Sequence, residues 1–187
     1  MEQIITALQN WESVRNNPSE LIALFANKSG LVLDMNLFPA GIPLHAYAGI
    51  KNDVFGFYVI SEANDVNSPM EVLSANCHWC PCTDQKNQII TEEEALLRIS
   101  SWQNEFEEWL NNVVTMPFGM YKTFHIPTTD LQPESYHALF ALKYDPITPA
   151  TKAADLVLKS DDGVYFDTVV GQPPYIDQYK YYILSLL

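Results

Sequence analysis

The sequence has few basic residues and no cluster of them. Lys and Arg together number 10, against 23 Asp and Glu, which gives a formal net charge of -13 at pH 7. Nucleic acids and anionic membrane surfaces attract basic stripes, so this charge balance argues against both as partners. A basic protein is the partner that the charge favours, although acidity alone also keeps a protein soluble.

The sequence also lacks long hydrophobic runs and a cysteine framework. No apolar run approaches the roughly 20 residues of a membrane-spanning helix, and residues 1–11 carry no signal-peptide pattern. The three cysteines, Cys77, Cys80 and Cys82, fall within six residues and cannot crosslink distant parts of a fold. We therefore expect a soluble protein of the reducing cytoplasm.

Glycine is scarce, with 7 residues, whereas apolar side chains make up 48% of the chain of 187 residues. A chain of this length buries roughly 70% of the surface that its unfolded form exposes, so it needs neither a metal nor disulfides to fold. No repeat or low-complexity linker divides the sequence. We therefore expect one globular domain over residues 1–187.

Apolar periodicity predicts helices first and strands next. The first thirty residues have helical spacing with a break at Asn17-Pro18, which predicts two helices. Alternating apolar residues then predict a three-stranded meander over residues 31–37, 44–50 and 54–61. The last two strands are expected to form a hairpin through Lys51-Asn52-Asp53.

The middle of the chain combines an irregular stretch with the clearest helix. Residues 62–90 have few periodic apolar positions and are predicted to be an irregular loop that carries the cysteines, with a short strand near Val72-Leu73 as the alternative. Thr91 and Glu94 then form a capping box. Beyond it, apolar residues recur every three or four positions as far as Val113.

The last third of the chain returns to strand patterns. Strands are predicted over residues 121–126, 136–144, 155–159 and 164–170, with a hairpin turn at Asp161-Asp162-Gly163, and residues 175–187 fit either a helix or a strand. Strands that come in runs between well-separated helices favour an α+β fold. We expect a mainly antiparallel sheet, with two N-terminal helices and one long central amphipathic helix packed on it.

The densest group of reactive side chains is Cys77-His78-Trp79-Cys80-Pro81-Cys82. Two cysteines three positions apart form a zinc knuckle, to which Cys82 or His78 would add a third ligand. A structural zinc site normally draws a second pair of ligands from elsewhere, for which the sequence offers His45, His125 and His137. One hypothesis is therefore zinc binding by Cys77, Cys80, Cys82 and His78.

The same residues suggest thiol redox chemistry. Trp79-Cys80-Pro81-Cys82 resembles a thioredoxin-type active site shortened by one residue, and Thr148-Pro149 with the strands after it resembles the closing half of that fold. The resemblance implies dithiol exchange. In that family, however, the dithiol opens a helix directly after a strand, whereas about nine residues separate Cys82 from Thr91.

A third interpretation of the cysteines needs no reactivity, because cysteine also packs as a small apolar residue. The sequence has no phosphate loop, no paired histidines on a helix and no nucleophile elbow. We therefore predict a non-enzymatic binding protein without catalytic residues or a cofactor, comparable with immunity proteins or secretion chaperones by charge and size only. The alternative function is zinc binding or thiol redox chemistry at the cysteine segment.

Overall fold

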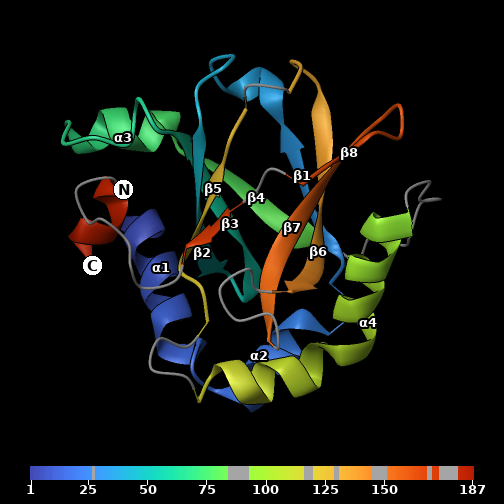
Figure 1. Cartoon of the computed structure of the whole chain (residues 1–187). Helices are drawn as coiled ribbons and strands as arrows, with labels where there is room; N and C mark the ends of the chain where they lie inside the picture. The colour runs from blue at the N-terminus through green and yellow to red at the C-terminus, as the bar shows by residue number, and fades with distance from the viewer. Residues whose placement is uncertain are drawn as a thin grey trace.

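The chain folds into four helices packed around a curled sheet in the part that the structure describes (Figure 1). This computed structural model describes residues 1–26, 28–83, 93–115, 120–128, 131–144, 151–167, 170–172 and 181–187. The helices are α1 (Glu2–Val14), α2 (Pro18–Phe25), α3 (Met70–Asn76) and α4 (Glu93–Val113), with short 3-10 helices η1 (Met35–Leu37) and η2 (Tyr182–Leu186). The strands are β1 (Gly30–Asp34), β2 (Leu44–Lys51), β3 (Val54–Ser61), β4 (His78–Thr83), β5 (Thr123–Ile126), β6 (Ser135–Tyr144), β7 (Lys152–Ser160), β8 (Tyr165–Phe166) and β9 (Val170–Gln172).

All nine strands in the described ranges belong to one antiparallel sheet, in the order β8-β7-β6-β1-β4-β3-β2-β5-β9. The sheet curls until β9 at one end lies against β7 near the other. Alternate residues of each strand therefore point into an inner core, and the residues between them point outward. Ala46 and Phe57 are buried in the inner core, whereas Tyr47 and Tyr58 face outward.

Helices close both the open end and the outer face of the curled sheet. The first half of α4 packs on the outer face of β6 and β7, and its second half runs along the lower end of the molecule in Figure 1. There Trp102 and Trp109 enter the inner core together with Phe25 of α2. On the other side, α1, α3 and residues 181–187 cover the outward residues of β2 and β3. A second apolar cluster results on that outer face.

Two local sequence features fix the centre of the sheet. Asn52 and Asp53 both have positive φ, 51° and 61°, as a tight β2–β3 hairpin turn requires. Gly56 faces β4 so closely that a Cβ atom there would lie 2.6 Å from the carbonyl oxygen of Cys80. Pro81 stands opposite Gly56 and lies outside the β1–β4 ladder, so its missing N–H interrupts no hydrogen bond of that ladder.

The predicted α+β fold is confirmed, with its antiparallel sheet, two N-terminal helices and long amphipathic helix. The predicted meander is wrong in one respect, because β1 pairs with β4 and β6 and not with β2. Local periodicity identifies a strand but not its partner, and β4 lies 44 residues after β1 when Asp34 is compared with His78.

The prediction of an irregular loop over residues 62–90 is wrong where α3 and β4 form. Helix α3 buries only Leu73, so it shows no apolar stripe, and Pro81 hides the strand pattern of β4. The capping residue Thr91 and the pair Thr148-Pro149 lie outside the described residues. Within the described ranges, no helix has both the length and the apolar character needed to cross a membrane.

Candidate metal centre

Three neighbouring strands bring two histidines and a glutamate together on the outer face of the sheet. His45 on β2 stands opposite His125 on β5 and opposite Ile60 on β3. Glu62 follows β3 and lies on the same face as Ile60, because side chains two residues apart share a face. The Glu62 amide donates to the Pro43 carbonyl at 2.8 Å and thereby extends the β2–β3 pairing.

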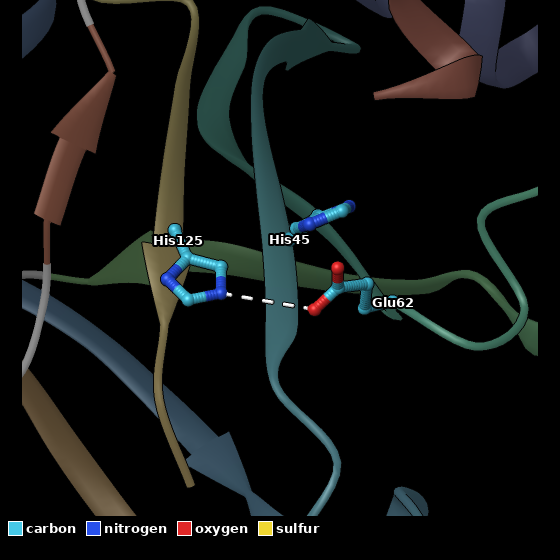
Figure 2. A group of neighbouring side chains, drawn as sticks. All are labelled: His45, Glu62 and His125. Atoms are coloured by element: carbon cyan, nitrogen blue, oxygen red, sulfur yellow. Dashed lines mark ion pairs between the residues drawn. The ribbon is translucent and has the colours of Figure 1, made fainter. Parts of the chain in front are cut away.

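The three side chains approach one another closely enough to share an ion. One donor atom from each of His45, Glu62 and His125 lies within 4.8 Å of the other two. Figure 2 shows the imidazole of His125 facing the carboxylate of Glu62, with 3.9 Å between Nε2 and Oε2. His45 is fully buried, whereas the side chains of His125 and Glu62 are 21% and 34% exposed. The group is therefore buried at His45 and accessible to solvent at His125 and Glu62.

A buried carboxylate orients His45. Its Nδ1 lies 2.6 Å from Oδ2 of Asp65, and the Tyr47 hydroxyl donates to the same oxygen. The side chains of His45 and Asp65 are both completely buried. Because a carboxylate only accepts hydrogen bonds, Nδ1 of His45 carries a hydrogen, and in the neutral imidazole Nε2 then keeps its lone pair. An Asp–His pair of this kind is the usual outer support of a metal-binding imidazole.

Nε2 of His45 is buried and has no hydrogen-bond partner among the described residues. A buried acceptor without a partner costs about 1–3 kcal/mol, so such an atom calls for a ligand. Since Asp65 already holds Nδ1, Nε2 is the nitrogen of His45 that remains available to an ion. The geometry combines an oriented imidazole with two further donors beside it.

Two imidazole nitrogens and one carboxylate oxygen are a known donor set for transition metals. Catalytic zinc sites and non-haem iron sites both use two histidines and one carboxylate. Around a tetrahedral ion with bonds of about 2.1 Å, two donors lie about 3.4 Å apart. The donors here, up to 4.8 Å apart, must therefore close in, which the partly exposed side chains of His125 and Glu62 permit.

Two tyrosines complete the surroundings and keep their protons. Burial, followed by the charge of Asp65 and its hydrogen bond, raises the pKa of Tyr47 well above its ordinary value. Burial, followed by the charges of Glu62 and Asp65, raises the pKa of Tyr181 to about 12. Tyr47 is therefore a hydrogen-bond donor to Asp65 at neutral pH.

Comparison of the chain with models of protein families, with curated proteins and with solved structures gave no match. The chemistry of the site is therefore inferred from its own residues and their geometry.

The cysteine segment lies elsewhere in the sheet. Cys80 and Cys82 pack in the inner core, whereas Cys77 packs in the outer cluster, so the three side chains do not converge. Burial is the main cause that raises the pKa of all three thiols, that of Cys80 to about 12. The ring of His78 contacts Phe38, 5.2 Å between centroids. Zinc binding and redox chemistry at this segment stay predictions.

The sequence pattern pointed to some of the site residues and missed others. His45 and His125, named from sequence as candidate zinc ligands, do come together, but with Glu62 instead of the cysteines. His137 lies apart on β6, with its Nε2 3.9 Å from Asp161. No local pattern marks Glu62 or Asp65 as a site residue, although the hairpin register places Glu62 on the face of His45.

Proposed function

We propose that this protein binds one divalent transition-metal ion of the zinc class through His45, Glu62 and His125. The observation that carries the proposal is the buried imidazole of His45, held by Asp65 at Nδ1 and without a partner at Nε2, next to two more donor residues. A zinc-class ion supplies the partner that Nε2 lacks.

The donor set selects the class of metal. Calcium and magnesium prefer oxygen ligands, whereas imidazole nitrogens suit zinc, copper, iron and nickel. Three protein ligands leave one position of a tetrahedral ion open for water or for a further ligand, as in catalytic zinc sites. The partly exposed side chains of His125 and Glu62 put that open position on the accessible side of the group.

Calorimetric titration of chelator-treated protein with zinc chloride tests this function. We expect saturable binding of one ion per chain, and we expect Glu62→Gln, which removes the charged ligand, to weaken the affinity by at least about tenfold. His137→Gln is the matched control, because it removes a histidine from outside the group. Wild-type protein without one-to-one binding, or a Glu62→Gln variant with unchanged affinity, would overturn the proposal.

A second candidate function is binding of a basic protein in the cytoplasm, which the net charge of -13 favours. A groove of about 530 Å³ between α1, α2 and the β2–β3 turn supports it, because apolar Val14 and Leu24 lie there beside the carboxylates of Glu20 and Asp53. The cysteines Cys77, Cys80 and Cys82 are free thiols, which agrees with the proposed location in the reducing cytoplasm.

A lysine-rich peptide tests this second function against a charge-matched control. Glu20→Gln with Asp53→Asn should weaken the binding of the peptide more than Glu107→Gln with Glu108→Gln, two exposed carboxylates of α4. Both double variants remove two negative charges, so equal weakening would show unspecific attraction only.

A further inference from the structure

Residues 181–187, referred to below as the 181–187 segment, cover the outer face next to His45. The ring of Tyr181 lies over the imidazole of His45, with 4.3 Å between centroids and 39° between planes. The side chain of Ile183 is completely buried in the outer cluster. The Tyr182 hydroxyl donates to Oδ1 of Asn67 at 3.0 Å. In Figure 1 the segment is the red helix beside the beginning of α1.

The same segment completes the hydrogen bonds of Asp65. Oδ2 of Asp65 accepts from His45 and Tyr47, and Oδ1 accepts from the backbone amide of Ile183 at 3.2 Å. The carboxylate is therefore fixed by three donors, and one of them, the Ile183 amide, lies 118 residues away in sequence. If the segment leaves, Asp65 loses one donor and His45 loses the ring that covers it.

We propose that the 181–187 segment is part of the metal centre and that metal binding is coupled to its docking. This inference rests on the proposed metal-binding function. Docking of Ile183 and Tyr181 fixes Asp65 and His45 in the orientation that presents Nε2 to the ion. By thermodynamic linkage, an ion that binds more tightly to the docked form must stabilise docking by the same factor. Tyr181 and Ile183 are thus positioning residues.

Zinc titration of two variants of Tyr181 gives the first test. Tyr181→Ala removes the ring over His45 and should weaken zinc binding by about tenfold, the low end of what loss of an outer support costs. Tyr181→Phe keeps the ring, and it should restore the wild-type affinity. Both variants lose the hydroxyl group, but only Tyr181→Ala loses the ring. The difference in zinc affinity between them therefore measures the contribution of the ring contact.

Hydrogen exchange of the Ile183 amide gives a second test that uses the wild-type chain. Exchange of this amide requires release from Asp65, so zinc should slow it by about the same tenfold that Tyr181→Ala costs in affinity. The Val164 amide, which donates to Ser160 in the β7–β8 turn, is the control and should exchange at an unchanged rate. In Glu62→Gln, the same zinc concentration should slow the Ile183 amide less than in wild type, because less of the variant is zinc-bound.

The two proposals fail in different ways. If wild-type protein binds one zinc ion but the Ile183 amide exchanges at the same rate with and without it, the coupling is refuted and the metal site stands. If Tyr181→Ala binds zinc as tightly as wild type, the positioning role of the ring is refuted. Wild-type protein that binds no zinc refutes both the metal site and the coupling. If Tyr181→Ala does not fold, the exchange rates of the Ile183 amide in wild type decide whether zinc binding and docking are coupled.

Discussion

Replacing Asp65 by Asn removes one charge at the point where three donors meet. In the wild type, His45 and Tyr47 donate to one carboxylate oxygen and the Ile183 amide donates to the other. An Asn side chain keeps one acceptor and turns the other into a donor. Where the amide nitrogen takes the place of Oδ2, Nδ1 of His45 can accept from it only if the histidine hydrogen moves to Nε2. That tautomer has no lone pair at Nε2 for a metal ion.

The magnitudes follow from the number of bonds affected. Hydrogen bonds to a charged group contribute about 1.5–3 kcal/mol each, and two of the three are disturbed, so we expect Asp65→Asn to lower the free energy of unfolding of the metal-free protein by about 3–6 kcal/mol. Loss of the outer support should weaken zinc binding by about 10- to 100-fold. Urea unfolding measures the first quantity and calorimetric titration with zinc measures the second.

Glu71→Gln is the control for Asp65→Asn, since it makes the same chemical change at an exposed position of α3. It should leave both stability and zinc affinity unchanged. Nitrogen chemical shifts of His45 report its tautomer and should show the hydrogen on Nε2 in Asp65→Asn. A variant with wild-type stability and wild-type zinc affinity would refute the role that we assign to Asp65.

Three further predictions concern the rest of the fold. Trp102→Ala should lower the free energy of unfolding by about 3–5 kcal/mol, because Trp102 is buried against Phe140 and Phe25; Leu97→Ala, at an exposed residue of the same helix, should leave the urea midpoint unchanged. Burial raises the pKa of Asp155 in spite of its ion pairs with Lys143 and Arg98, so the folded state holds the proton more tightly than the unfolded state. The stability of wild type relative to Asp155→Asn should therefore be greatest below the pKa of Asp155 in the unfolded chain, and it should fall as the pH rises through the pKa in the folded protein. Unfolding curves between pH 3 and pH 7 should show this sign, because an unperturbed Asp has a pKa of roughly 3.9. Because burial raises the pKa of all three thiols, that of Cys80 to about 12, a thiol reagent at about pH 8 should label native protein far more slowly than unfolded protein; one rapidly labelled cysteine would favour a redox role.

Local patterns predict the elements that carry their own signals. The helical spacing of residues before Gly30, the turn at Asn52-Asp53 and the amphipathic stripe of α4 each arise from residues close in sequence. The hairpin turn also sets a register, and this register already places His45 and Glu62 on one face. Half of the candidate metal centre can therefore be predicted from the sequence.

The other half depends on contacts between distant parts of the chain. His125 reaches His45 only because β5 pairs with β2, and no local pattern specifies that pairing. Asp65 and Ile183 meet through a single buried hydrogen bond across the outer cluster. The sequence around Asp65 predicts only an irregular polar stretch. In the fold, Asp65 accepts hydrogen bonds from His45, Tyr47 and Ile183 at the centre of a buried network.

In the cysteine segment, the residue spacing and the backbone conformation favour different arrangements of the thiols. Spacing alone places Cys77 and Cys80 where a tight turn would bring both thiols to one ion. The backbone instead leaves α3 at Cys77 and continues as the extended strand β4, whose side chains alternate between faces. Cys77 consequently packs in the outer cluster and Cys80 in the inner core.

X-ray absorption at the zinc edge of the one-to-one zinc complex tests the metal centre most directly, because it identifies the bound atoms without any substitution. With His45, Glu62 and His125 as ligands, the spectrum should contain only nitrogen and oxygen neighbours at about 2.0–2.2 Å, with the outer scattering pattern of imidazole rings. Sulfur neighbours at about 2.3 Å would contradict the assignment and place the ion at the cysteine segment instead.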